Sequence, residues 1–296
     1  MPIDLTKIPV SLTKAATDGR LVLFIGAGIS KQAKSKISQI LPNWPELIRD
    51  ILIIAASEGL DKEDEAAIER MIFEGKYLIA AQALKDYIPG NQFERFMRMR
   101  FQQGVVPGRI HRSLFKLRTP VIMTTNYDLL LEAAYVQLFA RQARVATPGY
   151  PDGVFRALKT PWDFDSPVIF KLHGSIVEPE NIVLGERDYY RLIYRQPHYR
   201  LALRTIFMTR IVLMIGFSFS DPDITDVMAE GMGGGGDFIV LPKGKKDRIE
   251  MRRLRRTFGV EVIEYEPSEG HPELFQLVEY IAGFASPRSK APSWSR

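Results

Sequence analysis

The sequence predicts an α/β fold, a parallel sheet with helices on both faces. Short, wholly apolar runs such as 21–25 and 211–215 alternate with stretches whose apolar residues have helical spacing. A strand that is apolar at every position is typical of a sheet buried on both faces. Four of these runs end in a small polar or glycine-rich cluster. Because the carboxyl ends of parallel strands share one edge, the clusters predict a single polar ligand site.

Length and composition limit the class of protein. The chain has 296 residues, of which 46% are hydrophobic and 25% charged. These values suit one large α/β domain or a domain with a sizeable insertion. No apolar run approaches the roughly 20 residues of a membrane span, and the N-terminus lacks the pattern of a signal peptide. We therefore expect a cytoplasmic protein with no membrane partner.

Cysteine is absent from the sequence. Disulfides, thiolate zinc sites and a catalytic cysteine are therefore excluded. The four histidines are scattered and show no metal-ligand spacing. We expect no metal in this protein.

The first part of the chain predicts a helix, a strand and then a long helical region. A short helix in 1–19 leads into the buried strand 21–25, and the polar stretch 31–39 that follows the glycine turn reads as a loop over a site. Residues 44–56 predict an amphipathic helix. No convincing strand appears in 57–118, so we expect a helical insertion there, packed beside the sheet domain.

Strands and helices alternate again from residue 119 onward. The expected strands are 121–124, 168–172, 211–215, 238–241 and 260–265, and the expected helices are 127–139, 186–208, 222–231, 247–258 and one from residue 271 to 284. Residues 147–167 are rich in proline and glycine and predict a loop. One domain is expected over 1–284, and 285–296 reads as a disordered tail.

The cluster after the first buried strand is GAGIS, and it is suited to phosphate. Gly26, Ala27 and Gly28 offer backbone N–H groups to a pyrophosphate, and Ser30 offers a hydroxyl. Glycine also permits a close approach of the phosphate. An ordinary turn explains the same residues, because a lone Gly-x-Gly is a weak motif.

The second and third clusters carry groups suited to catalysis. Asn126 and Asp128, in TTNYD, can hold hydroxyls or a carboxamide, although such residues after a strand often cap the next helix. His173, in KLHGS, titrates near neutral pH and can serve as a general base. It can equally be a structural histidine.

The fourth cluster is GFSFSD. In it Gly216 and Ser218 can take a second part of a nucleotide, such as a ribose, and Asp221 ends the cluster. The occurrence of four clusters at one edge favours a ligand site over four separate turns.

The charge is concentrated in residues 243–256, KGKKDRIEMRRLRR. This stretch has eight Lys or Arg against Asp247 and Glu250, whereas the whole chain has a net charge of only +5. We favour a helix with a solvated basic face over a patch that binds nucleic acid or an acidic partner.

Taken together and in this order, the four clusters resemble the motifs of the sirtuin (silent-information-regulator-like) NAD-binding domains. The resemblance covers residues 20–284 and is weakest in the helical stretch. It implies a Rossmann-like sheet with NAD held by the GAGIS loop, by Asp128 and by Gly216, Ser218 and Asp221. It also implies that Asn126 and His173 are the catalytic residues.

Departures from the deacylase pattern point to one branch of this family. Sirtuin deacylases carry a four-cysteine zinc module, which this chain cannot have, and Thr125 stands where they have glutamine. Pro42-x-Trp44 resembles bacterial sirtuin-like proteins that destroy NAD in antiphage defence. The resemblance therefore implies an NAD+ hydrolase that releases nicotinamide and ADP-ribose, with NAD as substrate and no metal.

Two other functions remain open from the sequence. An NAD-dependent protein deacylase shares the NAD site, and a nucleotide-sensing interaction subunit needs little catalysis. Because unregulated loss of NAD kills a cell, we expect gating by homo-oligomerisation or by a separately encoded partner, such as a HerA-type ATPase or a short Argonaute.

Overall fold

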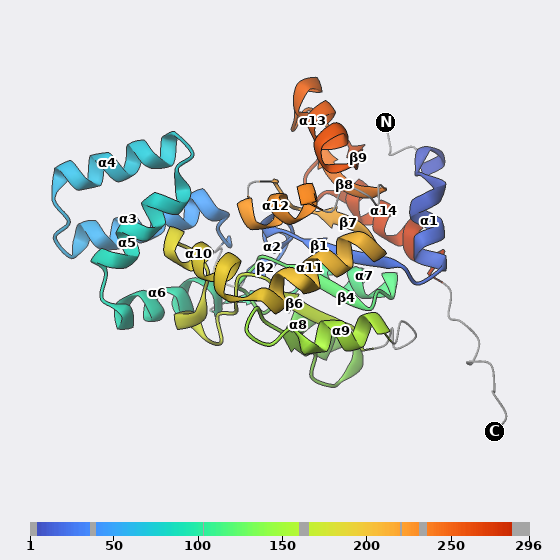
Figure 1. Cartoon of the computed structure of the whole chain (residues 1–296), viewed down its shortest axis with the longest axis horizontal. Coiled ribbons are helices and arrows are strands. Elements are labelled where there is room, and N and C mark those ends of the chain that lie inside the picture. Colours follow the sequence, from blue (N-terminus) through green and yellow to red (C-terminus); the bar gives the residue numbers. More distant parts are fainter. Residues whose placement is uncertain are drawn as a thin grey trace.

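The computed structural model describes residues 5–35, 40–102, 104–159, 166–219, 221–230 and 236–285 (Figure 1). Its centre is a seven-stranded sheet in which every pairing is parallel, which confirms the predicted fold class. The strands are β1 (Leu21–Ile25), β4 (Val121–Thr124), β5 (Arg144–Ala146), β6 (Val168–Lys171), β7 (Ile211–Ile215), β8 (Asp237–Pro242) and β9 (Val260–Tyr265).

The strand order across the sheet is β5-β6-β4-β1-β7-β8-β9. From β1 the chain forms β4 and then the edge strand β5, and it returns to place β6 between them. It then crosses to the other side of β1 and forms β7, β8 and β9. The direction of winding reverses at β1. Ligands bind at such a switch point, in the crevice beyond the carboxyl ends of the strands.

The side chains of β1 alternate between the two hydrophobic cores on the opposite faces of the sheet. Leu21, Leu23 and Ile25 pack with one set of helices, and Val22 and Phe24 pack with the other. All five are buried, as expected for a strand covered on both faces.

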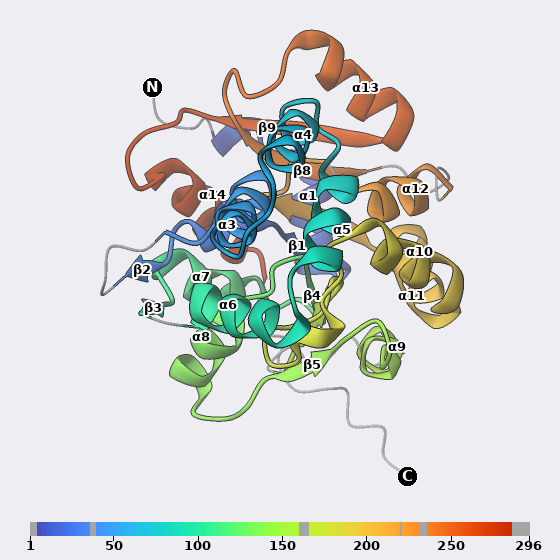
Figure 2. The same cartoon turned by 90° about the vertical axis from the view of Figure 1, so that its left-hand side faces the viewer.

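Helices cover the two faces of the sheet, as Figure 2 shows from the carboxyl-end side. One face is covered by α1 (Val10–Thr17), α7 (Arg109–Leu114), α8 (Leu130–Phe139) and α14 (Pro272–Ala282). The opposite core includes residues of α9 (Asp152–Lys159), α10 (Glu186–Arg195), α11 (Pro197–Thr209), α12 (Pro222–Glu230) and α13 (Arg248–Phe258).

A separate helical group lies beyond the carboxyl ends of the strands, at the left of Figure 1. It consists of α3 (Trp44–Ser57), α4 (Lys62–Phe73), α5 (Tyr77–Tyr87) and α6 (Gly90–Gln102), which share a third core. The sequence placed this insertion at 57–118. In the structure α3 belongs to it, whereas α7 packs on the sheet, because Ile110 and Leu114 bury themselves against the sheet core.

Some predicted loops contain secondary structure. A small antiparallel sheet pairs β2 (Lys34–Ser35) with β3 (Val105–Val106), so a short strand does lie within 57–118. Within 147–167 the chain forms α9, whose Val154 and Ala157 pack against the sheet. The predicted tail lies almost wholly outside the described residues.

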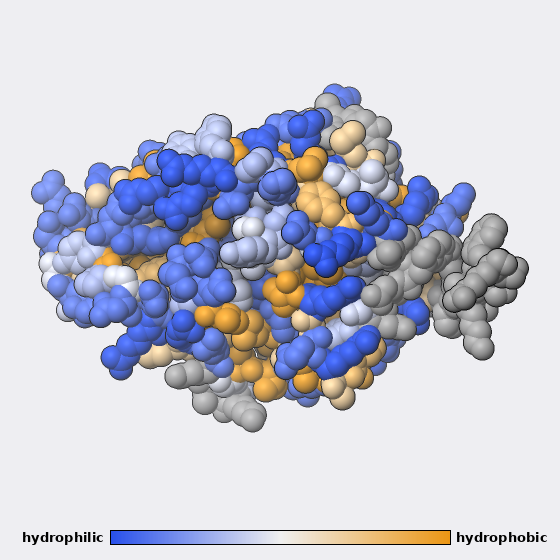
Figure 3. All heavy atoms as spheres, turned by 60° about the horizontal axis from the view of Figure 1, so that its bottom comes forward, coloured by the Kyte–Doolittle hydropathy of each residue, from blue (hydrophilic) through white to orange (hydrophobic). Residues whose placement is uncertain are grey.

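Hydrophilic residues predominate on the face shown in Figure 3, where hydrophobic ones form small groups. Within the described residues, no helix combines the length and the apolar character that crossing a membrane requires.

Gly26→Ala is expected to lower the free energy of unfolding by about 3 kcal/mol, since overpacking against a rigid neighbour costs this much. A Cβ at Gly26 would lie 2.3 Å from the carbonyl oxygen of Gly216, which is backbone and cannot swing away. Urea unfolding measures the change. The matched control is Gly90→Ala, at the first position of α6, where a Cβ meets no atom within 4 Å. Equal stability of the two variants would show that the β1 loop does not need glycine.

Candidate functional site

A cleft of about 570 Å³ opens beyond the carboxyl ends of β1, β4, β6 and β7. Every residue that the sequence selected for binding or catalysis lines it: Gly26, Ala27, Gly28, Ser30, Asn126, Asp128, His173, Gly216, Ser218 and Asp221. The structure thus brings four distant sequence clusters to one place. The helical group adds Trp44, Tyr77 and Phe101 to the wall, and the ends of β8 and β9 add Lys245 and Tyr265.

The glycines of the β1 loop pack directly on the end of β7. The N–H of Gly26 donates to the carbonyl of Ile215 at 2.9 Å, and the N–H of Gly28 donates to that of Gly216 at 3.0 Å. Gly216 itself has φ +70°, which favours glycine. These two N–H groups are therefore already used inside the protein. The sequence assigned them to a pyrophosphate, whereas the structure shows them holding two loops together.

Asn126, Ser30 and Asp128 form one hydrogen-bonded chain across the cleft floor. The Asn126 side-chain amide donates to the Gly26 carbonyl at 3.1 Å and to Ser30 Oγ at 2.8 Å. Ser30 Oγ donates to Asp128 Oδ2 at 2.6 Å. Both amide protons of Asn126 are thereby engaged, so its side-chain oxygen is the atom available to a ligand. The sequence analysis assigned the Ser30 hydroxyl to phosphate, but in the structure it donates its proton to Asp128.

Asp128 also caps the next helix, which was the structural interpretation of this residue. Its Oδ1 accepts from the N–H of Leu130 at 3.0 Å, in the first turn of α8. The buried Lys171 lies beneath it and donates to the Asp128 carbonyl and to Glu132 Oε1. Asp128 is 4% exposed. These contacts make it a residue that fixes the loop and, through Ser30, the orientation of Asn126.

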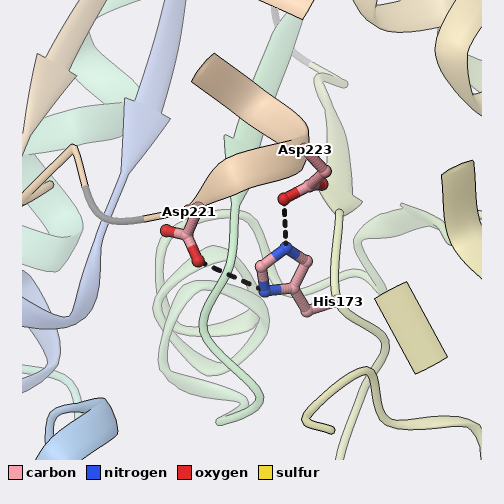
Figure 4. Close-up of side chains that lie close together, drawn as sticks. All are labelled: His173, Asp221 and Asp223. Atoms are coloured by element: carbon pink, nitrogen blue, oxygen red, sulfur yellow. Dashed lines mark hydrogen bonds and ion pairs between the residues drawn. The ribbon is translucent and has the colours of Figure 1, made fainter. Parts of the chain in front are cut away.

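His173 lies between two carboxylates (Figure 4). Its Nε2 is 3.4 Å from Asp223 Oδ1, and its Nδ1 is 3.9 Å from Asp221 Oδ1. Tyr199 donates to Asp223 Oδ2 at 2.6 Å, and Tyr189 donates to Asp221 Oδ1 at 3.2 Å. All five side chains are buried.

The burial and the charges of this cluster shift the pKa values of His173, Asp221 and Asp223. Burial alone would lower the pKa of His173, but the charge and hydrogen bond of Asp223, with a contribution from Asp221, raise it above its usual value. Burial raises the pKa of Asp221 to about 6. The pKa of Asp223 is lowered despite its burial, because His173 and Tyr199 stabilise its charge. A histidine whose pKa is raised and a carboxyl group whose pKa is about 6 therefore lie side by side in the cleft.

By residue type and spacing, His173, Asp221 and Asp223 could also hold a metal ion, since their ligand atoms lie within 4.8 Å of one another. Each carboxylate, however, faces a different ring nitrogen and accepts a tyrosine hydrogen bond. The geometry fits a hydrogen-bonded imidazole better than a metal ligand.

Aromatic rings close the cleft over His173. The Tyr189 ring meets His173 edge-on at 5.2 Å, and Trp44 stacks on Tyr189 at 6.0 Å. Trp44 starts α3, where Asn43 and Glu46 form a reciprocal capping box, and Glu46 also pairs with Lys31 at 2.6 Å. The start of the helical group is thereby tied to the chain just after the glycine loop.

Sequence reasoning missed several residues of this site. Asp223 follows Asp221 by two positions around a proline, and that spacing was the only signal for it. Tyr189 and Tyr199 lie on helices, and their pattern does not reveal that they meet His173. Lys245 and Lys246, from the stretch 243–256, line the cleft beyond the end of β8. The prediction of a solvated basic face did not include this.

Comparison with known proteins agrees with this geometry. Residues 120–263 match the family model described as a SIR2-like domain. The matched stretch is just under half of the chain. The matched region runs from the start of β4 into β9 and contains Asn126, His173 and Asp221, whereas the glycine loop precedes it.

Curated relatives match the chain at low identity. The chain is 26% identical to the NAD(+) hydrolase ThsA of Enterococcus faecium over 223 residues, covering 74% of this chain and 41% of that protein. It is 24% identical to a ThsA of Cytobacillus dafuensis, covering 90% and 50%, and 24% identical to the defense-associated sirtuin 2 of Bacillus subtilis, covering 72% and 19%. The chain thus spans half or less of the length of these relatives.

Ser30→Ala is expected to lower the free energy of unfolding by about 1–3 kcal/mol, because it leaves a buried Asp128 oxygen and an Asn126 N–H unpaired. Thermal unfolding measures the loss. The control is Ser57→Ala, which removes one exposed hydrogen bond to the Ile54 carbonyl and should change stability by less than about 0.5 kcal/mol. If both variants melt alike, Ser30 does not join Asn126 to Asp128.

Proposed function

We propose that this SIR2-like domain hydrolyses NAD+ at the bond between nicotinamide and ribose. The observation that carries the proposal is the meeting of Asn126 and His173 in one cleft with the glycine loop, at the switch point of a parallel sheet. The hydrolase names of the ThsA relatives support it.

The reaction requires no covalent intermediate with the protein and no acid for the leaving group. Nicotinamide leaves the cationic ring of NAD+ as a neutral molecule, so no acid is needed, and positive charge develops on the ribose. Water then adds to the ribose carbon and loses a proton. The products are nicotinamide, ADP-ribose and one proton. The site must therefore hold the dinucleotide, orient the ribose and water, and accept that proton.

The described residues suit these tasks. The side-chain oxygen of Asn126 orients a ribose hydroxyl or the water, and the cluster of His173 and Asp221 accepts the proton. The negative charges of Asp221 and Asp223 favour the developing ribose cation. Trp44 and Tyr189 exclude bulk water from this end.

The charges around the cleft are complementary to those of NAD+. NAD+ is cationic at nicotinamide and anionic at the pyrophosphate. Asp221 lines the cleft beside His173, with Asp223 behind the imidazole, and Lys245 and Lys246 line it beyond the end of β8. We place nicotinamide at the His173 end and the adenosine half toward the lysines, with the pyrophosphate beside the β1 loop at Ala27.

The biological role that we propose is depletion of NAD in the cytoplasm during antiphage defence. The name of the Bacillus subtilis relative supports it. Such an activity needs gating, either by self-assembly or by a separate partner protein.

Purified protein incubated with NAD+ is expected to release nicotinamide and ADP-ribose, measured by liquid chromatography. Asn126→Ala and His173→Ala should each lower turnover by on the order of 10²-fold or more, because each removes a group that orients or deprotonates the water.

The matched controls are Asn91→Ala and His198→Ala, both at exposed positions, which should keep the turnover of the wild-type protein. Turnover that survives both active-site substitutions would refute the site. A requirement for an acetylated peptide would instead identify a deacylase.

A further inference from the structure

Of His173, Asp221 and Asp223, only Asp223 does not line the cleft. It lies behind the imidazole on α12, is 2% exposed, and faces Nε2 rather than Nδ1. Tyr199 of α11, 0% exposed, holds its second oxygen at 2.6 Å. Tyr199 thus holds one oxygen of Asp223, and the other oxygen faces Nε2 of His173.

An ionised carboxylate can only accept hydrogen bonds. The pKa of Asp223 is lowered, so it is ionised at neutral pH. Nε2 must then carry a hydrogen in order to interact with it. A neutral imidazole has a single N–H, which leaves the lone pair on Nδ1, the nitrogen that faces Asp221.

The space beside Nδ1 suits a reacting oxygen. Nδ1 and Asp221 Oδ1 are 3.9 Å apart, too far for a direct hydrogen bond and close enough for one water or hydroxyl to contact both. Asp221 lines the cleft and is held by Tyr189.

We propose that Asp223, anchored by Tyr199, is a positioning residue that fixes the Nε2–H tautomer of His173 and so makes Nδ1 the proton acceptor on the cleft side. The use of that acceptor in NAD+ hydrolysis rests on the proposed function, whereas the tautomer is a property of the free protein. In the reaction, the proton leaves the attacking oxygen for Nδ1, and Asp223 balances the imidazolium that forms.

The groups that set the charge of His173 come from three elements. Asp221 and Asp223 face its ring nitrogens from the start of α12, Tyr189 of α10 contacts the ring edge, and Tyr199 of α11 reaches it only through Asp223. Removing the charge of Asp223 therefore lowers the pKa of His173 and leaves the contacts of Asp221 and Tyr189 in place.

The decisive experiment is the ¹⁵N spectrum of the full chain labelled at histidine, with His173→Ala used to assign the signals. The neutral form of His173 should show a protonated Nε2 and an unprotonated Nδ1. Asp223→Asn should abolish this preference, because the amide can donate to Nε2, and Tyr199→Phe should weaken it. A wild-type ring protonated at Nδ1 would overturn the proposal.

Turnover gives the second measurement. Asp223→Asn should lower kcat for NAD+ by on the order of 10²- to 10⁴-fold, since an equivalent change in a catalytic triad acts through the wrong tautomer. KM should change little, because Asp223 does not line the cleft. The acidic limb of the kcat/KM profile, where the base becomes protonated, should move to lower pH.

The matched control is Asp226→Asn, an exposed acid on the same helix, which should leave kcat, the pH profile and the spectrum unchanged. An Asp223→Asn protein with wild-type kcat and an unshifted limb would refute the positioning role. If that variant does not fold, the wild-type spectrum and Tyr199→Phe decide the tautomer. Absence of NAD+ turnover together with the expected spectrum would refute only the proposed function.

Discussion

The close approach of two backbones, at Gly26 and Gly216, is the constraint on which the rest of the site depends. Side chains at these positions would occupy the space of the opposite chain. Because the N–H of Gly28 bonds to Gly216, the turn after β1 is fixed against the end of β7. The carbonyl of Gly26 then receives the Asn126 amide from the end of β4. Three strands that are neighbours in the sheet are thereby joined at their carboxyl ends.

The same constraint explains how the two halves of the cleft differ. At the ends of β1 and β4, the chain of Asn126, Ser30 and Asp128 is held by hydrogen bonds to backbone and to one another, so its geometry is set by the sheet. On the β7 side, the residues that contact His173 come from helices. The histidine at the end of β6 is therefore oriented by tertiary packing, and its charge state is controlled from the helical layer.

Much of the sheet could be predicted because its signal is local. Wholly apolar runs such as Leu21–Ile25 identify buried strands without knowledge of their partners, and the rule that carboxyl ends share an edge then brings the polar clusters together. β5 and α9 were missed, since proline and glycine around them indicate a loop. The start and end of the insertion were misplaced, because α7 has the same amphipathic character as α3–α6 and only the core it joins distinguishes them.

The role of individual groups in the site was harder to predict than their location. Gly26 and Gly28 were correctly placed beside the cleft, yet a sequence cannot reveal that their N–H groups bond to β7. Likewise, Asp-Pro-Asp is a common start for a helix, and nothing local distinguishes Asp221, which faces the cleft, from Asp223, which lies behind the imidazole. The distinction is visible only in the fold, where Asp221 lines the cleft and Asp223 is held by Tyr199 of α11.

The helical group helps to bury His173, because Trp44 of α3 stacks on the Tyr189 ring that contacts the imidazole. The burial of this region raises the pKa of Asp221. In the same dry surroundings, an uncompensated charge on His173 would be costly, and Asp223 offsets that cost. Movement of α3 away from Tyr189 would admit water, weaken both effects and separate Glu46 from Lys31 beside the glycine loop. The contact between the insertion and the sheet domain therefore affects the surroundings of His173 through Tyr189 and Trp44.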